Sequence, residues 1–156
     1  MDIGFLSAVE LAKKIREKEI SCVELLQHYL SRVDKYNESI NAIVVDLREQ
    51  ALEEAKRLDN MVASGEHLGP LHGVPMTVKE SYNVSGTPTT FGNPAFRDNV
   101  TKTDAESIKK LKQAGANIFG KTNVPLGLAD FQSYNEVYSM LKIPSEESMT
   151  GYFSVH

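Results

Sequence analysis

The chain has 156 residues, of which 41% are hydrophobic and 24% charged, and its formal net charge is -4. This length suits about one domain of ordinary globular composition. The negative charge argues against a nucleic-acid or anionic-membrane partner, and no stretch approaches the ~20 apolar residues of a membrane span. Because a single cysteine excludes an intrachain disulfide, we expect a reduced, cytoplasmic protein.

Three amphipathic helices are predicted in the first third of the chain. Each begins at a capping box, in which a short polar side chain is followed three residues later by a carboxylate. The boxes are Ser7 with Glu10, Ser21 with Glu24, and Asp46 with Glu49. Apolar residues follow at helical spacing and usually face a core. We therefore interpret the helices as a layer that covers a sheet; the alternative is a partner-binding surface.

The most informative stretch of the chain is 68–93. Its apolar core, Val74 to Val78, runs directly into Lys79 and Glu80, with turn-forming glycines and prolines on both sides. This pattern predicts a short buried strand that delivers a lysine to its end, followed by a long loop. Such loops in compact domains are usually functional or disordered. Because this one follows a buried strand with a charge at its tip, we favour a functional loop.

A second strand is predicted from Asn117 to Phe119, after a helix that Thr103 and Glu106 would cap. A strand, a helix and a second strand form the unit of a parallel sheet, which is buried on both faces. The segment 42–45 is either an extended connector or a further strand.

Lys79 is the candidate catalytic residue. Lysine has an ordinary pKa near 10.4, and desolvation at the mouth of a buried strand would lower it and let the amine accept a proton. Hydroxyl side chains near it in the sequence, none in the context of an activated serine, are Ser81, Ser85, Thr87, Thr89 and Thr90. The alternative is a strand-end lysine that reaches water or pairs with Glu80.

Two other motifs are set aside. Residues 115–122 satisfy the P-loop pattern, but a helix precedes them and strand-like residues fill them, so we interpret the match as accidental. The histidines lack the spacing of metal ligands. We therefore expect neither a metal nor a cofactor.

The chain resembles the amidase signature family. The resemblance rests on Gly-Val-Pro-Met-Thr-Val-Lys-Glu (73–80), Gly-Thr-Pro-Thr-Thr-Phe-Gly (86–92) and Ala-Gly-Ala-Asn-Ile-Phe-Gly-Lys-Thr-Asn-Val-Pro (114–125). It implies a serine hydrolase that cleaves small-molecule carboxamides and folds as an α/β/α sandwich around a large mixed sheet. By the same resemblance, Lys79 is a base that acts through a bridging serine in a cis peptide to activate the nucleophilic serine.

The chain departs from the family after Tyr138, where the glycine- and serine-rich signature does not appear. We therefore expect an incomplete α/β/α amidase-type sandwich, in which 1–138 supply an N-terminal helical layer and a βαβ unit of a mixed sheet, and 139–156 form an unrelated tail. Without the serines and the oxyanion donors that supply most of the rate, a truncated chain would be inactive alone.

Two alternatives remain for the function. The first is a fragment of the amidase subunit of a glutamyl-tRNA amidotransferase. The second is a non-catalytic module that docks on a full-length relative or another protein. In either case, an open sheet edge would favour self-association or a partner chain.

Overall fold

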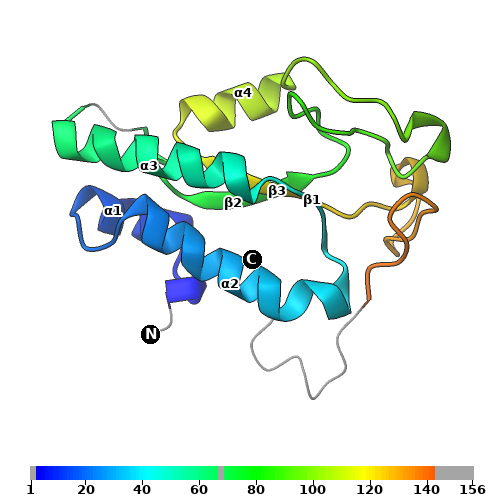
Figure 1. Cartoon of the computed structure of the whole chain (residues 1–156), viewed down its shortest axis with the longest axis horizontal. Coiled ribbons are helices and arrows are strands. Elements are labelled where there is room, and N and C mark those ends of the chain that lie inside the picture. The colour runs from blue at the N-terminus through cyan, green and yellow to red at the C-terminus, as the bar shows by residue number, and fades with distance from the viewer. Residues whose placement is uncertain (1–2, 67–68, 143–156) are drawn as a thin grey trace.

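The computed structural model describes residues 3–66 and 69–142. Its helices and strands, in chain order, are α1 (Ala8–Arg16), α2 (Cys22–Ile40), β1 (Ile43–Asp46), α3 (Arg48–Ser64), β2 (Pro75–Lys79), α4 (Glu106–Gln113) and β3 (Asn117–Thr122). Figure 1 shows the strands between α4 on one side and α2 on the other. This is the mixed α/β architecture that the sequence predicts.

The three strands form one mixed sheet in the order β1-β3-β2. The β1 strand pairs with β3 antiparallel, so a strand and not a connector occupies the segment after α2. The β2 strand pairs with β3 in parallel, with Val78 opposite Lys121 and Lys79 opposite Thr122. Because α4 lies between β2 and β3 in the chain, the predicted strand–helix–strand unit is confirmed.

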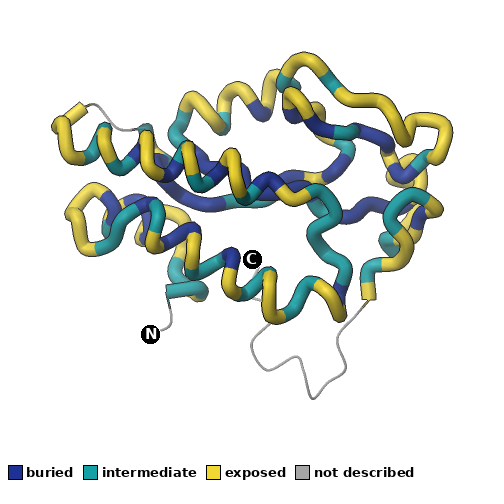
Figure 2. Tube along the Cα trace, viewed as in Figure 1, coloured by how far each residue is buried: buried dark blue, intermediate teal, exposed yellow. Residues whose placement is uncertain are grey.

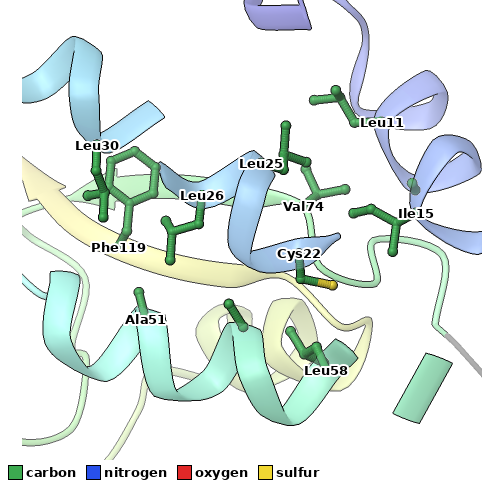
Figure 3. Packing of buried hydrophobic residues seen from close by; sticks show 12 residues of the cluster. Leu11, Ile15, Cys22, Leu25, Leu26, Leu30, Ala51, Leu58, Val74 and Phe119 are labelled. Atoms are coloured by element: carbon green, nitrogen blue, oxygen red, sulfur yellow. The ribbon is translucent and has the colours of Figure 1, made fainter. Parts of the chain in front are cut away.

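Both faces of the sheet are covered. On one face, Phe119 packs with buried residues of α1, α2 and α3, and Figure 3 shows it beside Leu26 and Leu30. On the other face, Ile118 packs with Val78 and with Ile108 of α4. Figure 2 shows the resulting band of buried residues along the strands. The apolar stripes of the leading helices thus form core, as the covering-layer interpretation predicted.

The first two capping boxes are confirmed. In α1 the Glu10 carboxylate accepts from the Ser7 N–H at 2.8 Å, and the Ser7 hydroxyl oxygen accepts from the Glu10 N–H. Ser21 and Glu24 repeat this arrangement at the start of α2. No helix of the described chain is long and apolar enough to cross a bilayer.

The other two predicted boxes are wrong. Helix α3 begins after Leu47, without a side-chain cap, and the Asp46 carboxylate instead accepts from the N–H of Arg48 at 2.9 Å. Helix α4 begins after Ala105, so Thr103 lies too early to cap it. The Leu47 N–H donates to Phe119 O of β3 and the Ala105 N–H donates to Asn83 O of the preceding loop, so each helix begins one or two residues later than the local pattern predicts.

The long loop between β2 and α4 is ordered by its own hydrogen bonds. Its outgoing and returning arms run side by side, with the Gly86 N–H donating to Thr101 O at 2.8 Å and the Thr89 N–H donating to Asn99 O at 3.0 Å. Figure 1 shows this loop meeting the segment after β3 at one end of the molecule. Both segments therefore gather at the end of the sheet where β2 and β3 finish.

Candidate functional site

Lys79 occupies the position that the sequence predicts, because it is the last residue of β2. The next residue, Glu80, donates its backbone N–H to Thr122 O at 2.9 Å, and a turn closes when the Tyr82 N–H donates to Lys79 O at 3.0 Å. The carboxyl ends of parallel strands are where open α/β sheets bind ligands. The backbone of Lys79 is thus fixed at a suitable edge.

The surroundings of the Lys79 side chain differ from the expectation. The side chain is exposed, because neighbours along a strand face opposite sides and both Val78 and Glu80 are buried. Among residues 3–66 and 69–142, no hydrogen bond or ion pair engages the amine. The described residues therefore do not supply the expected desolvation, and Glu80 is not an ion-pair partner of Lys79.

Glu80 is a buried carboxylate with three donors. It accepts from the Thr90 N–H at 2.6 Å, from the Phe91 N–H at 3.0 Å and from the Tyr138 hydroxyl at 3.2 Å. Burial raises the pKa of Tyr138 to about 12, and the nearby Glu80 charge adds to this shift. The phenol therefore stays protonated and donates at neutral pH.

Lys121, on the neighbouring strand, is a second buried charge. Its amine donates to the hydroxyl of Thr89 at 2.9 Å, to the hydroxyl of Thr87 at 3.3 Å and to Pro88 O. Burial lowers the pKa of Lys121 to about 8, while the Glu80 carboxylate acts in the opposite direction. In the sequence this lysine belongs to the false P-loop match and to the 114–125 segment of the family resemblance; its place in β3, opposite buried Val78, is the signal that it too faces inward.

Four of the five hydroxyl side chains near Lys79 in the sequence, those of Ser85, Thr87, Thr89 and Thr90, have structural roles. Ser85 donates to Lys102 O, and Thr87 donates to Val84 O. Thr90 accepts from the Gly92 N–H. None of the hydroxyls in the described part of the chain is bonded to the Lys79 amine.

Two asparagines, Asn123 and Asn135, hold the segment that carries Tyr138. The Asn135 amide donates to Asn123 Oδ1 at 2.9 Å, and its carbonyl oxygen accepts from the N–H groups of Val137 and Tyr138. These bonds fix the backbone of Tyr138, whose hydroxyl reaches Glu80. The sequence does not predict this pair, since asparagine in a loop carries no period that marks it as buried.

Other candidate features lie elsewhere. A cavity of about 350 Å³ lies between α3, the start of the long loop and β3, and it does not include Lys79. His72 is buried and bonds to Leu58 O. Within the described residues, no group of three His, Cys, Asp or Glu side chains is placed to hold a metal ion. The P-loop match falls on the turn after α4 and on β3, so it does not join a strand to a helix as a phosphate-binding loop does.

Comparison with known proteins decides the family. A family model described as Amidase matches residues 24–150. The chain belongs to the amidase family. An acylamidase of Rhodococcus erythropolis is 42% identical over 124 residues, which are 80% of this chain and 26% of that protein. A glutamyl-tRNA(Gln) amidotransferase polypeptide of Carboxydothermus hydrogenoformans is 38% identical over 80% of this chain and 26% of its own length.

Solved amidase-family structures share the fold. A fatty acid amide hydrolase superposes with a TM-score of 0.83 at 30% identity, over 88% of this chain and 24% of that one. The chain spans about a quarter of the length of the relatives it matches. The similarity therefore establishes the family and the fold of this chain.

Proposed function

We propose that the chain contributes the proton-accepting lysine of an amide-hydrolysing site, with Lys79 as the base. One observation supports this proposal: Lys79 ends a buried strand within the Gly-Val-Pro-Met-Thr-Val-Lys-Glu segment, and its amine, which no described residue engages, lies at the edge of the sheet where open α/β sheets generally bind ligands. Relatives named as acylamidase and fatty acid amide hydrolase support a carboxamide as substrate.

The chemistry needs a neutral amine and a hydroxyl nucleophile. The amine takes the hydroxyl proton as the oxygen attacks the amide carbon, and the proton later goes to the departing amine or ammonia. By family resemblance a bridging serine relays this proton. Water then hydrolyses the acyl-enzyme. Because no described hydroxyl bonds to Lys79, we propose that the serines come from outside residues 3–66 and 69–142, and that this chain alone does not turn over amides.

A chimera tests the role of Lys79. The segment of the Rhodococcus acylamidase that matches this chain is replaced by the corresponding residues of this chain, and hydrolysis of an aryl amide is measured. We expect activity in the chimera and a loss of about a thousandfold or more in kcat with Lys79→Met, because the nucleophile then has no base.

Lys110→Met is the matched control, since Lys110 is an exposed lysine of α4. Its chimera should keep full activity. A Lys79→Met chimera as active as its parent would refute the proposed base. Lys79-dependent turnover by the 156-residue chain without added segments would instead refute its inactivity alone.

A non-catalytic docking module is the second candidate function. It is favoured by the outer edge of β2, which pairs with no strand in the described part of the chain. Several large apolar side chains in the loops that follow β2 and β3 are also exposed, among them Phe91, Phe131 and Tyr134. An unpaired edge of this kind can accept a strand from another chain.

A further inference from the structure

Two buried charges lie on one side of the sheet next to Lys79 and have no part in the proton transfer described above. Glu80 follows β2 directly, and Lys121 lies in β3 opposite Val78. Side chains two residues apart on a strand share a face, so Val78, Glu80 and Lys121 lie on the same side. Both charged side chains are fully buried.

The two charges bind consecutive parts of one loop segment. Lys121 binds its first half through the Thr87 and Thr89 hydroxyls and Pro88 O. Glu80 binds its second half through the N–H groups of residues 90 and 91. Five successive residues, 87–91, are therefore held by a cation at one end and an anion at the other.

The end of this segment adopts a backbone conformation that costs energy. Phe91 has a φ of 54°, in the left-handed region that a non-glycine residue rarely enters, and Gly92 follows with a φ of 68°. A Cβ at Gly92 would lie 2.6 Å from the Asn135 Cβ. Strain of this kind persists only where the surroundings over-determine it, and it concentrates at functional sites.

The segment is also tied back to Lys79. The Thr89 hydroxyl donates to Tyr82 O at 3.4 Å, and the Tyr82 N–H donates to Lys79 O. Glu80 is the immediate neighbour of Lys79 in the chain. The position of the loop and the position of the strand end are therefore fixed together.

We propose that Glu80 and Lys121 are positioning residues, forming a two-charge clamp that fixes residues 87–91 and, through the bond of Thr89 to Tyr82, the end of β2 that carries Lys79. The clamp itself is formed by described residues, and its effect on catalysis rests on the proposed function of Lys79. Charge-assisted hydrogen bonds are the stronger kind, and a buried charge that loses its partner is penalised, so the clamp tolerates little displacement.

Glu80→Gln tests the clamp in the complete 156-residue chain, because it removes the charge and one acceptor while keeping the shape. Glu136→Gln is the matched control at an exposed site in the same region. Amide hydrogen exchange at Thr90 and Phe91 should become about tenfold to a hundredfold faster in Glu80→Gln and stay unchanged in the control. Exchange rates equal to those of the parent chain would overturn the clamp.

A second readout separates the charge from the shape. The side-chain resonance of Lys121, followed by NMR against pH, should titrate at lower pH in Glu80→Gln, because the ammonium loses its nearby anion. An unchanged midpoint would overturn the pairing of the two charges. Should Glu80→Gln fail to fold, Thr89→Val removes one acceptor of Lys121 without changing any charge. It should lower the same midpoint while Thr90 and Phe91 stay protected from exchange.

The chimera described above tests the link to catalysis. Glu80→Gln should lower kcat by about tenfold to a hundredfold with little change in KM, since it loosens the loop that holds the end of β2 and leaves the Lys79 amine itself unchanged. An unchanged kcat would overturn the positioning role. A parent chimera without activity would count against the proposed function, and exchange and titration would still decide the clamp.

Discussion

Lys121 shows how a single buried charge can be held at a cost. Taking an ammonium out of water is unfavourable, and its three acceptors and the nearby Glu80 carboxylate offset only part of that penalty. The pKa of about 8 expresses the remainder, because the folded state binds this proton less tightly than the unfolded chain does.

This linkage predicts a pH dependence of stability. Between pH 8 and pH 10 the unfolded chain, with an ordinary lysine pKa of 10.5, binds more protons at Lys121 than the folded chain. The contribution of Lys121 to the free energy of unfolding should therefore rise with pH across this window. The rise is at most about 1.4 kcal/mol per pH unit, and solvent screening makes it smaller. Urea unfolding at several pH values, in the native chain and in Lys121→Met, measures it.

The difference between native chain and variant isolates Lys121 from the other groups that titrate at alkaline pH. Burial raises the pKa of the Cys22 thiol, which lowers stability at alkaline pH in both proteins alike. Tyr138 bonds to Glu80 and has a pKa raised to about 12. Its phenol therefore stays protonated across this window in the folded chain. The native-minus-variant difference should rise with pH, and a flat difference would contradict the depressed pKa.

At this scale the sequence predicted the position of Lys79 but not its neighbourhood. The strand end follows from an apolar run that stops at a charge, which is local information. The burial of Glu80 depends on Thr90 and Phe91 folding back over it, which no local pattern contains. Alternation along the strand, with Val78 and Glu80 in phase, is the one signal that could have indicated an inward-facing carboxylate.

The turn before β2 sets how this strand enters the sheet. Gly73 has a φ of 74°, and a Cβ there would lie 2.3 Å from the Cys22 Sγ and 2.9 Å from the Ile15 Cδ1. The close contact joins α1, α2 and the start of β2 at one point. Glycine is therefore required here for both its backbone conformation and its lack of a side chain.

Gly73→Ala should lower the free energy of unfolding by about 2–5 kcal/mol, from the left-handed backbone and from overpacking together. Gly65→Ala is the matched control, since its φ is 71° and nothing lies within 4 Å of the added Cβ. It should cost only about 1–2 kcal/mol. Urea midpoints followed by circular dichroism measure both, and equal losses would show that the packing at Gly73 is not tight.

Among the elements, helices were predicted better than their starts. Ser7 and Ser21 bond to Glu10 and Glu24 and cap as expected. Asp46 is the last residue of β1, and Asp104 next to Thr103 is engaged by the Ser85 N–H and by Lys112 at 2.8 Å. A capping pattern fails where the sheet or a distant loop uses the same residues.

For the whole molecule, the sequence predicted a βαβ unit with a helical layer, and the structure contains both. The sequence did not decide whether the segment of β1 is a strand or a connector, because four residues show too little of a pattern to separate the two. The antiparallel partner of β1 lies more than seventy residues later in β3, so only the folded chain reveals the pairing.

The unpaired outer edge of β2 predicts association at this scale. Light scattering coupled to size-exclusion chromatography should show the purified chain as a dimer or larger species at micromolar concentration, since exposed strand edges pair readily. Replacing edge residue Met76 by Lys should shift the population toward monomer, whereas the same change at exposed Val9 of α1 should not. A native chain that is monomeric throughout would contradict this predicted self-association through the β2 edge.

The pairing of β1 with β3 also bears on how the protein is made. The ribosome releases 43–46 long before 117–122, so the sheet cannot close until most of the described chain has been synthesised. Until then the core that α1, α2 and α3 form lacks Phe119, and the apolar surface that later receives this side chain stays uncovered. The nascent chain should therefore depend on chaperones late in translation, in the interval before β3 emerges.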